Sequence, residues 1–390
     1  MYSSFYLSLS AIQIIVIGIL LITFVVQLLY YLGCYTKVLV YKNKIKKDKI
    51  PFNTTQPAVS VIVCAKNESE NLAKLLPSVL EQVYPSYEVI VINDASTDES
   101  EDLLVILKQK YPHLRTSFVP QAAKYIDSKK IAVVLGIKAA KNDILLFTDA
   151  DCMPKRPDWI EKMVRNFDDS TEIVLGYGAY RQEKGFLNHL IGYDTLFIAV
   201  QYLNFALAKK TYMGVGRNMA YRKTLFYKNK GFASHLNIQS GDDDLFINEA
   251  ASTTNTKIEI NPNSITISEP HSTFSGWLNQ KQRHISTSKY YKLSRKAILG
   301  TELITRGLFY TSLLTLFIIL PQNTVFLITL GSLFLIRYGI QLYIINSIAH
   351  TLGERKYYST IFIFDILLPL LNLYLWIRSG LHKKDRYKWK

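Results

Sequence analysis

The chain has 390 residues, of which 49% are hydrophobic, and a net charge of +15. Its three cysteines, Cys34, Cys64 and Cys152, lack the spacing of a disulfide framework or a metal site and are typical of a reducing compartment. The basic excess would allow nucleic-acid binding, but it is concentrated in residues 37–56 and 379–390, next to long apolar runs. Such clusters mark the cytoplasmic side of a membrane and contact anionic lipid, so we expect a bilayer and no nucleic acid as partner.

Residues 1–36 are interpreted as an N-terminal transmembrane anchor. They carry no charged side chain and exceed the ~20 apolar residues that cross a bilayer. Because the run lacks the basic start and cleavage site of a secretory signal, we expect the anchor to be retained. The basic linker at residues 37–56 then places the following domain, residues 57–294, in the cytoplasm.

Strand-like and helix-like patterns alternate in this domain. Single helices separate apolar strand segments, which predicts an α/β fold with a mostly parallel sheet covered on both faces. Ligands bind beyond the carboxyl ends of the strands in such sheets. The predicted strands are Val59–Cys64, Glu88–Ile92, Arg115–Val119 and Ile144–Phe147, and the predicted helices between them are Asn71–Val83, Asp98–Tyr111 and Lys129–Lys141.

Carboxylates stand where three predicted strands end. Glu68 follows the first strand and can favour the start of the next helix. Asp94 follows the second strand, where it can shape a turn or accept hydrogen bonds from a nucleoside. Asp149 and Asp151 follow the strand Ile144–Phe147 in the sequence LLFTDAD. Two carboxylates in this position favour a divalent cation, because Mg²⁺ and Mn²⁺ prefer oxygen ligands and bridge substrate phosphates.

Farther along, the apolar segment Phe186–Ala208 predicts a helix that either packs on the sheet or lies along the membrane interface. Three consecutive acids, Asp242, Asp243 and Asp244, then stand at a predicted helix start. Clustered carboxylates raise one another's proton affinity, which suits a general base, although helix capping explains one or two of the three.

The sequence QKQRH, residues 280–284, follows Trp277 shortly before the membrane segments. Arg283 can bind a diphosphate, and Trp277 can stack on a sugar ring. A basic amphipathic helix lying on lipid would explain the same residues without a ligand.

Residues 295–378 are predicted to return to the membrane. Leu303–Leu320 and Val325–Ile345 can each span it, with Arg306 and Arg337 near the cytoplasmic ends, where their side chains can snorkel to water.

The last apolar segment, Tyr358–Ile377, contains Asp365 and Pro369, which disfavour a plain lipid-facing helix. A full crossing would also put the basic tail, residues 379–390, outside. The segment is therefore either a further span or a re-entrant or interfacial helix, and we expect the tail in the cytoplasm.

The order of these motifs, from Val59 to His284, resembles the family 2 glycosyltransferases, inverting enzymes with a GT-A fold. The resemblance implies a nucleotide-diphospho-sugar transferase domain with a Rossmann-like, mostly parallel sheet between N-terminal and C-terminal transmembrane helices. It also implies a nucleotide-sugar donor, a divalent metal (Mg²⁺ or Mn²⁺) and a lipid or glycan acceptor. Together with the charge pattern, it predicts a multi-pass protein of the cell (inner or plasma) membrane with a cytoplasmic catalytic domain.

The resemblance also assigns residues. Asp242 matches the catalytic base, and Asp243 remains its rival because Gly241 replaces the usual glutamate; Asp151, with Asp149, matches the metal ligands. The implied donor contacts are Glu68, Asp94, Lys130 or its neighbour Lys129, Asp149, Gln280, Arg283 and His284, where His284 stands in place of the family's tryptophan. The acceptor contacts are placed at Gly216, Arg217, Asn218 and Trp277.

Two other functions use the same motifs. A processive polysaccharide synthase of the same family would retain the QxxRH element, although a few spans leave little protein to build a channel. A non-catalytic, nucleotide-binding membrane scaffold would have no use for both the DxD pair and the acids around Asp242.

Overall fold

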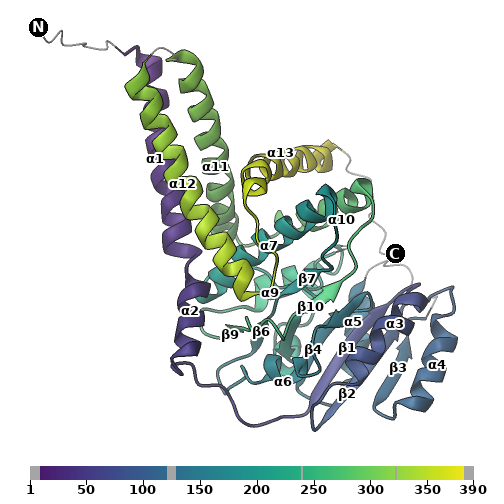
Figure 1. Ribbon diagram of the computed structural model, residues 1–390. Coiled ribbons are helices and arrows are strands. Elements are labelled where there is room, and N and C mark those ends of the chain that lie inside the picture. The colour runs from purple at the N-terminus through teal and green to yellow at the C-terminus, as the bar shows by residue number, and fades with distance from the viewer. Residues whose placement is uncertain (1–8, 121–128, 239, 321–322, 382–390) are drawn as a thin grey trace, which may run out of the picture.

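The computed structural model describes residues 9–120, 129–238, 240–320 and 323–381, which form an α/β domain and a projecting helical bundle (Figure 1). In the bundle, α1 (Ala11–Leu28) lies beside α11 (Leu293–Ile319) and α12 (Thr324–Thr351). A π-helical segment (Leu29–Cys34) connects α1 to α2 (Lys37–Lys46), which leads into the domain. Among the described residues, five helices are long and apolar enough to cross a membrane: α1 with its extension into α2, α7 (Phe186–Leu207), α11, α12 and α13 (Ser359–Leu381).

The main sheet has seven strands in the order β3-β2-β1-β4-β8-β6-β9. The first four in this order pair in parallel, which confirms the predicted sheet; β8 is antiparallel to both β4 and β6, and β9 is parallel to β6. A second sheet has the order β5-β10-β7. The strands are β1 (Val59–Ala65), β2 (Tyr87–Asn93), β3 (Leu114–Phe118), β4 (Ile144–Asp149), β5 (Cys152–Pro154), β6 (Ile173–Leu175), β7 (Gly178–Tyr180), β8 (Met219–Arg222), β9 (Thr256–Ile258) and β10 (Thr266–Ser268).

Helices cover both faces of the main sheet, because alternate strand residues point to opposite sides. In β1, Val61 and Val63 join the core beneath α3, α4 and α6, whereas Ile62 and Cys64 join the core beneath α5 and α7. The domain helices are α3 (Ser69–Leu80), α4 (Ser100–Lys110), α5 (Lys129–Ala139), α6 (Trp159–Val164), α7 (Phe186–Leu207), α8 (Lys223–Lys228), α9 (Asp244–Ala250) and α10 (Phe274–Ser288).

α7 is a helix of the protein core. Leu190, Tyr193 and Leu203 are fully buried, and 78% of its most apolar window lies inside the protein. Of the two dispositions that the sequence allowed, packing on the sheet is therefore the observed one, although α7 has the length and composition of a span.

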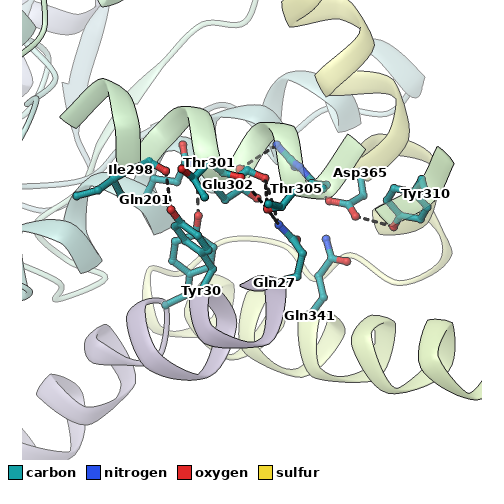
Figure 2. Close-up of polar contacts among 12 residues, drawn as sticks. Gln27, Tyr30, Gln201, Ile298, Thr301, Glu302, Thr305, Tyr310, Gln341 and Asp365 are labelled. Carbon is teal, nitrogen blue, oxygen red and sulfur yellow. Dashed lines mark hydrogen bonds and ion pairs between the residues drawn. The ribbon is translucent and has the colours of Figure 1, made fainter. Parts of the chain in front are cut away.

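The prediction that Arg306 and Arg337 snorkel to water is wrong. Both guanidinium groups are buried and form ion pairs with Asp365 of α13 (Ser359–Leu381), at 3.2 Å and 2.9 Å. Figure 2 shows Asp365 and Tyr310 pointing toward each other in this network. A buried carboxylate offered the arginines a partner that no sequence pattern predicted.

Candidate active site

A cleft of about 870 Å³ lies at the carboxyl ends of β1 and β4. This is the edge at which a parallel sheet is expected to bind ligands. The predicted site residues that line the cleft are Glu68, Lys129, Asp149, Asp151, Gly216, Arg217, Asp242, Asp243, Gln280, Arg283 and His284. The fold therefore gathers side chains from six separate segments of the chain.

The carboxylates of Asp149 and Asp151 form the floor of a candidate metal site. Their oxygens and the thiol of Cys152 lie within 4.8 Å of one another. Burial raises the pKa of the Cys152 thiol well above its usual value, and the thiol contacts Ser268 Oγ at 2.8 Å, so it is a poor ligand for a hard cation. Burial and the charge of Asp149 also raise the pKa of Asp151. A bound Mg²⁺ or Mn²⁺ would offset that repulsion, and the two carboxylates fit such an ion.

Two adjacent lysines at the start of α5 point in different directions. Lys129 Nζ contacts the Asp149 carboxylate and lies 3.7 Å from Asp242 Oδ2. Lys130 is buried and donates to two backbone carbonyls of the segment 235–238, each at 2.6 Å. Consecutive helical residues point about 100° apart, and the two carbonyl contacts hold the Lys130 ammonium away from the carboxylates that Lys129 meets. Lys129 is the lysine that faces it.

Asp242 and Asp243 have different surroundings. Both carboxylate oxygens of Asp243 accept hydrogen bonds from backbone N–H groups, those of Gly216 and Asp244, each at 2.7 Å. Asp242 instead lines the cleft beside Lys129. Burial, together with the charges of Asp243 and Asp149, raises the pKa of Asp242, while Lys129 opposes this shift. A carboxylate with raised proton affinity suits a general base.

Asp244, the third acid in the row, does not line the cleft. Its carboxylate receives the hydroxyl of Thr287 and, at 2.7 Å, that of Tyr291. Burial and the neighbouring Asp243 raise the pKa of Asp244 to about 7. Asp244 thus ties the start of α9 to the end of α10, which explains why three acids follow one another here.

α10 presents Gln280, Arg283 and His284 to the cleft. Gln280 Oε1 accepts a hydrogen bond from Tyr180 at 3.0 Å, and the Arg217 guanidinium lies 4.4 Å from the centre of the Tyr180 ring. Tyr180 was not predicted, because it lies in a three-residue strand without a motif.

Four of the predicted site residues are not among the described residues that line the cleft: Asp94, Lys130, Asn218 and Trp277. Trp277 is only 3% exposed and packs against Phe274, so its ring cannot stack on a sugar in this conformation. Asn218 is buried and holds Trp159 and two backbone carbonyls in place. Asp94 is buried just after β2, and its backbone N–H donates to the carbonyl of Ala65 at 2.8 Å.

Comparison with known proteins supports the motif order read from the sequence. Residues 60–229 match the model of glycosyl transferase family 2. This segment of the chain is similar to that family.

Several known glycosyltransferases are similar to parts of this chain. Glycosyltransferase AglE of Haloferax volcanii is 32% identical over 125 residues, which cover 32% of this chain and 40% of AglE, so the match spans less than half of that relative's length. The probable glycosyltransferase YdaM of Bacillus subtilis is 23% identical over 332 residues, or 78% of this chain and 75% of YdaM. The mannosyltransferase PcManGT from Pyrobaculum calidifontis, solved in complex with GDP-Man and Mn²⁺, shares the fold with a TM-score of 0.57 and 18% identity, over 94% of this chain and 100% of that chain.

A buried ion pair fixes α10 to α7. Lys281 Nζ contacts both carboxylate oxygens of Asp194, at 2.7 Å and 2.8 Å, and both side chains are buried. Lys281 points away from the cleft, while its neighbours Gln280 and Arg283 line it. The pair therefore sets which face of α10 meets the cleft.

Removing one partner of this pair should destabilise the protein strongly. Asp194→Asn leaves the Lys281 ammonium buried without its counter-charge, and we expect a loss of about 3–5 kcal/mol in the free energy of unfolding. The double variant Asp194→Leu, Lys281→Met should recover most of this loss, because apolar pairs of similar volume replace buried ion pairs well. Denaturant unfolding in detergent measures both. A loss below about 1 kcal/mol in Asp194→Asn would show that the pair does not fix the helix.

Proposed function

We propose that this chain is an inverting, metal-dependent glycosyltransferase that moves a sugar from a nucleotide-sugar donor to a lipid-linked or glycan acceptor at a membrane. The observation that carries the proposal is the meeting of the Asp149 and Asp151 pair, Asp242 and Arg283 around one cleft. A metal site, a carboxylate base and a guanidinium for phosphate are the groups that in-line displacement of a nucleoside diphosphate needs.

The donor is proposed to lie with its diphosphate between α5 and α10. Lys129 and Arg283 would neutralise the diphosphate, with Gln280 and His284 beside them, and Glu68 and Asp94 would bind the nucleoside. Asp151 and Asp149 would hold a divalent cation, which when bound supplies Lewis-acid stabilisation of the leaving diphosphate. The similar fold of a mannosyltransferase that holds GDP-Man and Mn²⁺ supports this arrangement.

Asp242 is the proposed base. It would take the proton of the acceptor hydroxyl as that oxygen attacks the anomeric carbon, and a single displacement of this kind inverts the configuration. The hydrogen bonds of Asp243 to two backbone N–H groups support Asp242 over its neighbour, because they occupy both oxygens of Asp243. Gly216 and Arg217, which also line the cleft, are the proposed acceptor contacts.

The acceptor is proposed to meet the enzyme at the cytoplasmic surface of the cell membrane. The basic residues of α2, which follow the α1 span directly, support a cytoplasmic domain. The boundaries that we propose are those of the sequence: anchor 1–36, linker 37–56, catalytic domain 57–294, membrane segments 295–378 and tail 379–390. A single transfer is favoured over processive synthesis, and the length of the product distinguishes the two.

The test is a screen of the purified full-length protein in detergent against a panel of nucleotide sugars, with Mn²⁺ or with EDTA. We expect one donor to release nucleoside diphosphate, only in the presence of the metal. No release from any donor, together with no binding of UDP or GDP in the presence of Mn²⁺, would contradict the proposal.

A further inference from the structure

α13 exposes an apolar surface over most of its length. Between Ser359 and Ile377 the sequence contains one charged residue, Asp365, and this side chain points inward. The exposed apolar side chains are Phe362, Ile363, Leu370, Leu373, Tyr374, Trp376 and Ile377, each 40–64% exposed. A surface with so many exposed apolar side chains marks a contact with lipid or with another protein.

The direction of α13 differs from that of the candidate spans. Figure 1 shows α13 running across the direction of α1, α11 and α12, close to the α/β domain, rather than alongside them. It contacts α10, α7 and α11. If the bundle crosses the bilayer, α13 lies in the plane of the membrane on the side of the α/β domain. The lipid that surrounds the bundle then also contacts the exposed face of α13.

A buried network holds α13 in this direction. The Asp365 carboxylate contacts Arg306 and Arg337 and accepts a hydrogen bond from Tyr310 at 2.6 Å. Arg337 also donates to Gln27 of α1 at 2.9 Å, so that side chains of α1, α11, α12 and α13 meet at one point (Figure 2). A carboxylate here is too costly to move into lipid without its partners, which fixes one end of α13 to the bundle.

The other end of α13 reaches the active site. Arg378 lines the cleft together with Asp242 and Arg283. Arg378 is 13 residues beyond Asp365, which is about 20 Å along a helix. α13 therefore connects the buried network to the mouth of the cleft.

We infer that α13 is a membrane-surface helix whose exposed face lies in the lipid of the leaflet next to the catalytic domain, and that Asp365 holds it there. A second inference rests on the proposed function: the acceptor is a lipid. Its head group enters the cleft beside Arg378 while its chains stay in the membrane. Tyr374 and Trp376 near this end fit the preference of aromatic side chains for the membrane interface.

Three residues on one face of α13 allow a direct test. Ile363, Leu370 and Ile377 are seven residues apart and 48%, 59% and 48% exposed. Single spin labels at these positions, in the full chain reconstituted in phosphatidylcholine and phosphatidylglycerol vesicles with Cys34→Ala, report depth from accessibility to oxygen and to a water-soluble nickel chelate. We expect the three depths to agree within a few ångström. A steady change of about 10 Å per seven residues would mean that α13 spans the membrane and would overturn the inference.

The matched control uses Ile328 and Leu335 of α12, also seven residues apart and each 64% exposed. Their depths should differ by about 10 Å if α12 is a span. High accessibility of all α13 labels to the nickel chelate and low accessibility to oxygen would place the helix in water and would also overturn the inference.

The role of Asp365 is tested with the double variant Asp365→Leu, Arg337→Met. It leaves Arg306 paired with Glu302, at 3.3 Å, so no charge remains uncompensated. We expect an unchanged far-ultraviolet circular dichroism spectrum and depths that no longer agree along α13. If the double variant folds and the three label depths still agree, Asp365 does not hold α13 in the membrane plane. None of these measurements requires a donor, so they succeed or fail independently of the glycosyltransferase activity.

Discussion

Replacement of Asp242 with asparagine should lower the rate of sugar transfer by a factor of about 10² to 10⁴, while nucleotide binding is retained. Asparagine keeps the size and polarity of the side chain but cannot accept the proton of the acceptor hydroxyl. Because Asp242 lines the cleft beside Lys129, its replacement by an isosteric side chain should leave the fold intact. Product formation with the donor identified by the screen, and binding of its nucleoside diphosphate, measure the two effects separately.

The matched control is Asp243→Asn. Asparagine is as good an N-cap as aspartate, and its side-chain oxygen keeps one of the two backbone hydrogen bonds of Asp243. Because the other bond is lost, we expect transfer within about tenfold of the natural protein. Full activity in Asp242→Asn would remove the proposed base. A large loss in the Asp243 variant with a small loss in the Asp242 variant would exchange their roles.

Replacement of Asp151 with asparagine should abolish the effect of Mn²⁺ on nucleotide binding. In the natural protein, Mn²⁺ and nucleoside diphosphate at 100 times their dissociation constant should stabilise the fold by about 2.7 kcal/mol, seen as a higher melting temperature. The variant should not show this increase, because it lacks one of the two oxygen ligands.

The melting temperature of Asp151→Asn without metal tests the repulsion between the two carboxylates. Burial and the charge of Asp149 raise the pKa of Asp151, so the ionised carboxylate of Asp151 is unfavourable in the metal-free protein. Removing one charge should leave the melting temperature of the metal-free protein equal or higher. Cys152→Ser is the control, and it should keep the Mn²⁺ effect. An Mn²⁺ effect of natural size in Asp151→Asn would place the metal elsewhere.

Local patterns were enough to predict the sheet and the edge that carries the site. Apolar runs marked β1, β2 and β4. Glu68 after β1 and Asp149 at the end of β4 line the cleft because the carboxyl ends of parallel strands share one edge, whereas Asp94 after β2 is buried and does not line it. The third strand was also found, although it is an edge strand with alternating burial. Sequence motifs placed site residues correctly where the position of a residue at the end of a strand was enough to bring it to the cleft.

Side-chain direction was harder to predict. Lys129 and Lys130 are equivalent in a motif, but a helix turns by about 100° per residue and only Lys129 meets the cleft. Trp277 fits a sugar-stacking role by type and place, yet its side of α10 faces the core. Buried ion pairs such as that of Arg337 with Asp365 depend on contacts between distant helices, and no periodic pattern in one segment reports them.

A crystal structure of the protein with Mn²⁺ and the nucleoside diphosphate of its donor, with the metal located by its anomalous signal, would locate the proposed donor site. We expect Mn²⁺ on the carboxylates of Asp151 and Asp149, with the diphosphate within reach of Lys129 and Arg283 and open space beside Asp242. An anomalous peak away from these carboxylates, or a nucleotide bound outside this cleft, would contradict this expectation.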